Sequence, residues 1–104
     1  STQFSLSKVR DNLILAQNLV PEVENQLRKF HKKRKLSQQQ KEVASEIASI
    51  IIANEDPSYW KDNISKYITN PIDSNEGRIK EIREIAYEHQ VDDYLASILY
   101  NSKI

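Results

Sequence analysis

The most distinctive chemistry in the sequence is a cluster of cations within eight consecutive residues. Its members, called the basic cluster from here on, are Arg28, Lys29, Lys32, Lys33, Arg34 and Lys35. The four adjacent cations at 32–35 match a simple nuclear-targeting signal, and such clusters also bind the phosphates of nucleic acids or anionic lipids. A structural explanation competes with these, because cations in the last turn of a helix offset the negative end of its dipole.

A nucleic-acid interface needs more than positive charge. Single-strand binders interleave aromatic side chains with basic ones so that bases can stack. Here, however, Trp60 and all five tyrosines come after residue 58. A helix that reads DNA presents base-edge donors on its first turns, but the helix expected over 75–90 carries four glutamates that would repel phosphate. These patterns disfavour DNA and leave nucleic acid as an alternative partner.

Residues suited to catalysis are scarce. The chain has two histidines, no cysteine and one glycine, so it lacks thiolate chemistry and a glycine-rich phosphate loop. His31 lies among cations, which disfavour a metal, and His89 falls on an apolar stripe, which favours an interior or interface position. Asp92 and Asp93, beside Glu88, form the only local carboxylate group, and helix capping explains them equally well. The sequence predicts a non-enzymatic protein with no cofactor and no metal site.

Three sets of residues are candidates for contact with a partner. Leu15 and Leu19 form a second apolar edge on the first helix, which either packs within the domain or presents a ridge to a partner. Tyr59, like Tyr100, lies off its apolar stripe, and tyrosine is favoured at interfaces. The third set is an acidic helix face that would bind basic peptides unless it is simply solvated; it consists of Glu81, Glu84 and Glu88, with Asp92 and Asp93 nearby.

The element expected to organise these residues is a core helix over 37–53. Ser37 and Gln40 have the spacing of a capping box, which predicts where the helix begins. One of its faces, at helical spacing, carries Val43, Ile47, Ile50 and Ile51. Ile52 points away from Val43, so the last two turns are apolar nearly all round and need neighbours on several sides.

Two helical segments are expected before the core helix. The first begins at Ser5 or Ser7, either of which can cap it, and runs towards Val20. Pro21 then either kinks a continuous helix or opens a second one over 21–34.

Three further helices are expected after the core helix, over 57–69, over 74–90 and from Asp92 or Asp93 onward. Trp60 should lie on the inner face of the first of these. Asp73 and Glu76 have the spacing of a second capping box. The final residues, 101–104, should fray.

Length and composition fit a single helical domain over 1–104. One glycine and three prolines leave little turn chemistry for hairpins. The predicted fold is all-α, as a compact bundle or a short right-handed stack of about five to six helices. No apolar run is long enough to span a membrane, and the cysteine-free sequence without an apolar leader is compatible with a cytoplasmic or nuclear protein.

Charge is distributed unevenly although its sum is zero. Residues 1–36 carry a net charge of +5 and residues 37–104 carry −5. The two parts either attract each other in the folded chain or bind separate partners.

The function that these patterns favour is a protein–protein interaction domain of the adaptor or scaffold kind, binding another protein or a peptide. In one version of this hypothesis the chain is the amino-terminal part of a larger protein. The first alternative is binding of nucleic acid or anionic lipid through the segment 28–35. The second alternative is a small inhibitor or immunity-type helical bundle. The oligomeric state does not follow from the sequence.

Overall fold

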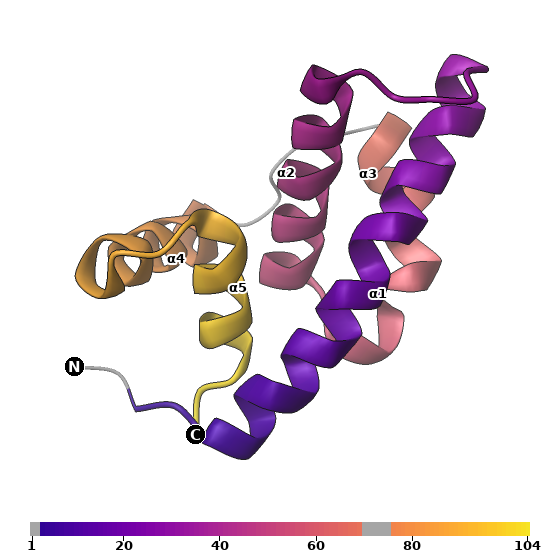
Figure 1. Ribbon diagram of the computed structural model, residues 1–104. Coiled ribbons are helices and arrows are strands. Elements are labelled where there is room, and N and C mark those ends of the chain that lie inside the picture. Colours follow the sequence, from indigo (N-terminus) through magenta and orange to yellow (C-terminus); the bar gives the residue numbers. More distant parts are fainter. Residues whose placement is uncertain (1–2, 70–75) are drawn as a thin grey trace.

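The computed structural model describes residues 3–69 and 76–104, and within them five α-helices and two short 3-10 helices follow one another (Figure 1). Their bounds are α1 Leu6–His31, α2 Gln38–Asn54, η1 Pro57–Tyr59, η2 Lys61–Asn63, α3 Ile64–Thr69, α4 Glu76–His89 and α5 Asp93–Asn101. The prediction of an all-α bundle of about five helices is confirmed. Helices α1, α2 and α3 pack together, and α5 packs on both α1 and α2 and carries α4 on its other side.

Helix α1 is continuous through Pro21, so the expected second helix over 21–34 is part of α1. The Ser5 side chain caps its start by accepting a hydrogen bond from the Lys8 amide. Pro21 lies on the exposed side, where water can satisfy the carbonyl that has lost its amide partner. The helix ends at Lys32, whose φ of 55° is left-handed and whose amide bonds back to Lys29.

Helix α2 begins with the predicted capping box. The Ser37 hydroxyl accepts from the Gln40 amide at 3.1 Å, and the Gln40 side chain accepts from the Ser37 amide at 2.9 Å. The prediction that neighbouring elements cover the last turns of α2 on several sides is confirmed, since Ile47, Ile51 and Ile52 are buried. Val43 is 40% exposed and was wrongly placed in the core. It borders an open groove beside the end of α1, because α1 has no further turn there to cover it.

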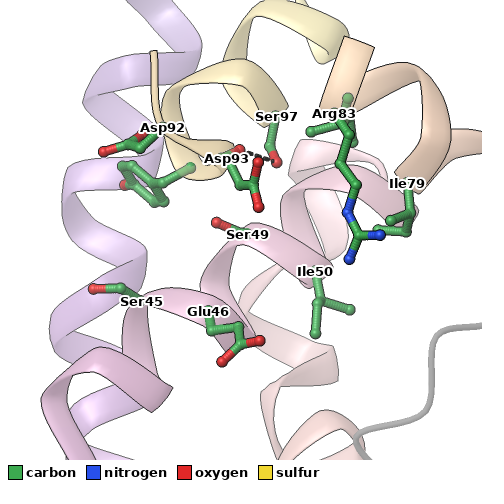
Figure 2. A pocket seen from close by; sticks show the side chains of 11 residues that line it. Ser45, Glu46, Ser49, Ile50, Ile79, Arg83, Asp92, Asp93 and Ser97 are labelled. Carbon is green, nitrogen blue, oxygen red and sulfur yellow. Dashed lines mark hydrogen bonds between the residues drawn. The ribbon is translucent and has the colours of Figure 1, made fainter. Parts of the chain in front are cut away.

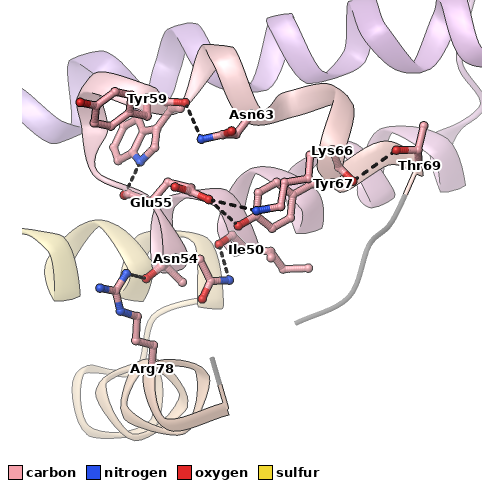
Figure 3. Close-up of polar contacts among 11 residues, drawn as sticks. Ile50, Asn54, Glu55, Tyr59, Asn63, Lys66, Tyr67, Thr69 and Arg78 are labelled. Carbon is pink, nitrogen blue, oxygen red and sulfur yellow. Dashed lines mark hydrogen bonds and ion pairs between the residues drawn. The ribbon is translucent and has the colours of Figure 1, made fainter. Parts of the chain in front are cut away.

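The segment after α2 folds back over α1 and is fixed by Glu55 (Figure 3). The Trp60 indole N–H donates to the Glu55 carbonyl at 2.9 Å, and the Tyr67 hydroxyl donates to the Glu55 carboxylate at 2.9 Å. Trp60, Tyr67 and Ile64 are buried in the main core. The prediction that Trp60 is a core residue is confirmed.

Helix α4 lies at the edge of the molecule and is held chiefly by α5. Only Ile82 and Ile85 of α4 are buried among its described residues. His89, expected at an interior or interface position, is exposed and therefore not interior; its ring lies edge-on to the ring of Phe4, with the centroids 5.5 Å apart. Asp73, predicted to cap this helix, lies outside the described residues.

The carboxyl end of the chain is anchored, and the expectation that it frays is wrong. The Asn12 side chain donates to the buried Ser102 hydroxyl at 2.9 Å, and that hydroxyl donates to the Ile98 carbonyl at 2.6 Å. The Ser5 amide also donates to the Ser102 carbonyl at 3.1 Å. A buried polar side chain on α1 therefore holds α5 in place, which a pattern of apolar spacing does not reveal.

Candidate functional site

A pocket of about 390 Å³ opens between α2, α4 and α5 (Figure 2). Its size is at the lower end for small-molecule sites and suits a single large side chain. The apolar part of its wall comes from Ile50 on α2 and from Ile79 and Ile82 on α4. The polar part consists of Ser45, Glu46, Ser49, Arg83, Asp92, Asp93, Tyr94 and Ser97.

Three carboxylates in this wall come from two different elements. Glu46 belongs to α2, Asp92 caps α5, and Asp93 lies in the first turn of α5. Asp92 accepts a hydrogen bond from the Leu95 amide at 2.8 Å, which fixes its side chain. Both aspartates therefore lie at the amino-terminal end of α5, where the helix dipole favours negative charge.

Among the described residues of the lining Arg83 is the one cation, and it extends from α4 towards α2 (Figure 2). Across residues 3–69 and 76–104, no ion pair within 4.0 Å joins it to a carboxylate. The lining therefore has more negative than positive charge.

Tyr94 adds a hydroxyl to the wall. Burial, together with the nearby Asp92 carboxylate, raises the pKa of Tyr94 to about 12. The hydroxyl is therefore protonated at neutral pH and can donate a hydrogen bond.

The Leu15–Leu19 edge, expected either to pack within the domain or to form a ridge for a partner, is divided between the two possibilities. Leu19 is only 1% exposed, because η1, η2 and α3 fold over this side of α1, whereas Leu15 remains 45% exposed. Both leucines line a shallow groove together with Pro57 and Trp60. Leu19 is thus a core residue, and Leu15 is the part of the predicted ridge that stays accessible. Tyr59 is also exposed, as predicted.

The predicted acidic face divides into two regions. Glu81, Glu84 and Glu88 are exposed on α4 and do not line the pocket, whereas Asp92 and Asp93 do. Glu81 is bound by Lys103 at 3.0 Å, and Lys103 also lies over the ring of Tyr100, which is half-buried and so less accessible than expected.

Sequence reasoning missed Glu46 and Arg83 as pocket residues. Ser45, Glu46 and Ser49 form a short polar strip beside the apolar face of the core helix, and this strip was the available signal. Nothing local connects it to Arg83 or to the aspartates, because those residues follow about forty positions later.

The basic cluster lies at the end of α1 and in the turn that follows, far from α4 (Figure 1). Five of its six cations line a shallow hollow in which no described lining residue carries a carboxylate: Arg28, Lys29, Lys32, Lys33 and Arg34. The ion pairs found in the described parts of the chain, Lys66–Glu55 and Lys103–Glu81, do not involve this cluster. Cations without such partners keep their full charge available for an external anion.

Two features are absent from the described residues. No group of three or more histidine, cysteine, aspartate or glutamate side chains there has the geometry to hold a metal ion. Within the same residues, no helix combines the length and apolar character needed to cross a membrane.

Comparison of the chain with models of known protein families, with curated proteins and with solved structures gave no match.

Proposed function

We propose that this chain is a non-enzymatic protein-interaction domain that binds a basic segment of a partner protein at the α2–α4–α5 pocket. The observation that carries the proposal is the composition of the pocket wall: three isoleucines beside three carboxylates, with a single arginine against them. Neither histidine nor cysteine is among the lining residues, which favours binding over nucleophilic or acid–base catalysis.

A lysine or arginine side chain matches this wall in both of its parts. Its methylene stem would pack on the three isoleucines while its charged head meets Glu46 and Asp93, since long basic side chains combine apolar and charged surface in this way. Charge-assisted hydrogen bonds to carboxylates are shorter and stronger than neutral ones. The serine hydroxyls and the protonated Tyr94 hydroxyl would form hydrogen bonds with the backbone of the partner next to that side chain.

The negative charge around the pocket extends beyond the lining. Glu84 and Glu88 stay exposed on α4 and contribute to the field that a basic segment meets as it approaches. Binding at the pocket should therefore weaken as salt rises, mainly through slower association. We propose that the domain acts inside the cell. Disulfide bonds are rare there, so a chain without cysteine lacks no stabilising bond that its neighbours have.

A basic-peptide library, measured by fluorescence anisotropy at low and physiological salt, tests this proposal. Glu46→Gln should weaken the best binder roughly fivefold to thirtyfold, as expected for a lost charge-assisted bond of about 1–2 kcal/mol. Glu42→Gln is the matched control, because it removes the same charge from the same helix at an exposed position outside the pocket. Equal effects of the two substitutions would contradict a specific site, as would a library without any salt-sensitive binder.

A further inference from the structure

An apolar surface that lies mostly outside the pocket is found at the same end of α1 as the basic cluster. Phe30 belongs to the last turn of α1 and is 57% exposed, although the ring of His31 packs edge-on against it at 5.2 Å. Beside it runs a groove of about 300 Å³. Its apolar lining is Leu27, Phe30, Val43, Ile47, Ile50 and Ile68, and its polar lining is His31 and Glu46.

Cations and apolar area therefore occupy neighbouring surfaces at one end of the molecule. Arg28 and Lys29 precede Phe30 directly, and Lys32 and Lys33 follow it by one helical turn or less. All four cations line one hollow at the same end of α1. A protein usually attaches to a bilayer through two signals acting together, apolar insertion and attraction to anionic headgroups.

We propose that the basic cluster and Phe30 together form a contact site for a membrane surface rich in anionic phospholipid. Phe30 enters the boundary between headgroups and acyl chains, and the cations of the cluster meet the phosphates and carboxylates around it. The exposed Val43 adds apolar area on the same side. The groove beside Phe30 shares Ile50 and Glu46 with the pocket, whereas Phe30, Val43 and the basic cluster lie outside the pocket lining, so the membrane contact can be tested separately from the proposed function.

The observations favour a bilayer over a nucleic acid. An exposed phenylalanine and valine gain free energy in an acyl environment but gain little from a sugar–phosphate backbone. Nucleic-acid binders without sequence preference present successive aromatic platforms along a basic groove. Apart from the Phe30–His31 pair, the tip of α1 offers no such platform among the residues that line the hollow and the groove.

Co-sedimentation of the full chain with phosphatidylcholine vesicles, with and without phosphatidylserine, tests the electrostatic part. Binding should require phosphatidylserine and should weaken with salt. The double substitution Lys32→Gln and Lys33→Gln should lower partitioning on the order of 10-fold to 30-fold, from about fivefold for each charge near the surface. The control pair Lys61→Gln and Lys80→Gln removes two exposed charges elsewhere and should change partitioning less than about threefold.

Exposed aromatic residues provide a matched test of insertion. Phe30→Ala should lower partitioning roughly fivefold to tenfold through lost apolar burial. Tyr87→Ala, at a helical position that is 89% exposed, should leave it unchanged. Phe30→Leu should restore most of the binding. Circular dichroism of each variant confirms that the fold is retained.

Three results would overturn the proposal. One is the absence of vesicle binding at low ionic strength, and another is an equal loss from Phe30→Ala and Tyr87→Ala. The third is tighter binding to duplex or single-stranded oligonucleotides than to vesicles at equal phosphate concentration. Glu46→Gln separates the two sites, because it should weaken the basic peptide at the pocket without weakening the attachment to anionic vesicles.

Discussion

The α2–α4–α5 pocket and the basic cluster both concentrate charge, but they assemble it in different ways. The cluster is contiguous in sequence and needs only the end of one helix to present it. The pocket combines Glu46 with Asp92 and Asp93, which meet only after α5 has packed against α2. Charge in the first region is a property of the local sequence, whereas charge in the second is a consequence of the tertiary fold.

This difference predicts different sensitivities to mutation. Changes that loosen the packing of α5 should impair the pocket long before they affect the cluster, because α1 still presents its cations if α5 moves.

Ile98→Ala should lower the free energy of unfolding by about 2–5 kcal/mol, since the side chain is fully buried between α5 and the main core. Urea denaturation followed by circular dichroism measures this. Leu6→Ala, at an exposed position on α1, should change stability by less than about 0.5 kcal/mol. Similar values for the two variants would show that α5 is not held by the core as described.

Asn12→Ala should cost about 1–3 kcal/mol, because it leaves the buried Ser102 hydroxyl without its donor. Asn18→Ala is the matched control on the same helix, where an exposed asparagine bonds only to its own helix. That control should be neutral or slightly stabilising because alanine favours helix. Thermal unfolding of both variants shows whether the hydrogen bond between Asn12 and Ser102 stabilises the folded chain.

Arg83→Gln should strengthen binding of a basic peptide to the pocket by roughly 1.5-fold to fivefold, as expected for removal of one partly exposed like charge worth about 0.2–1 kcal/mol. Lys80→Gln, one turn earlier on α4 and outside the pocket, is the control. Weaker binding by the Arg83 variant would mean that this arginine itself holds the partner.

Tyr94 provides the smallest effect, which appears only in alkaline solution. Its pKa is raised from 10.0 to about 12 in the folded chain, so its contribution to stability is complete below pH 10. The contribution is lost as pH rises towards 12, because the unfolded chain releases the phenolic proton first. An ultraviolet titration of Tyr94→Phe should lack the component near pH 12 that the unmodified chain shows.

Local rules predicted much of this fold. The Ser37–Gln40 capping box, the apolar end of α2 and the burial of Trp60 follow from helical spacing and short-range hydrogen bonding, and all three are confirmed. Local rules failed where distant segments decide the outcome. Leu19 is buried because residues 57–69 return to cover it, and Ser102 is ordered because Asn12 lies opposite.

The candidate site also has parts that the local sequence predicts and parts that depend on distant segments. The basic cluster can be recognised because its cations are close together in the sequence. The two aspartates of the pocket could be predicted as candidates for capping a helix. Their combination with Glu46 could not be predicted, because it depends on the position at which α5 crosses α2. Long-range packing of this kind leaves no periodic signal in a single sequence.

The most direct test of the pocket is an amide chemical-shift titration with N-acetylarginine amide as the probe. A specific site predicts saturable shifts confined to 45–50, 79–83 and 92–97, and their loss in Glu46→Gln but not in Glu42→Gln. Shifts that do not saturate, or that centre on Glu84 and Glu88 along the outside of α4, would contradict the proposal.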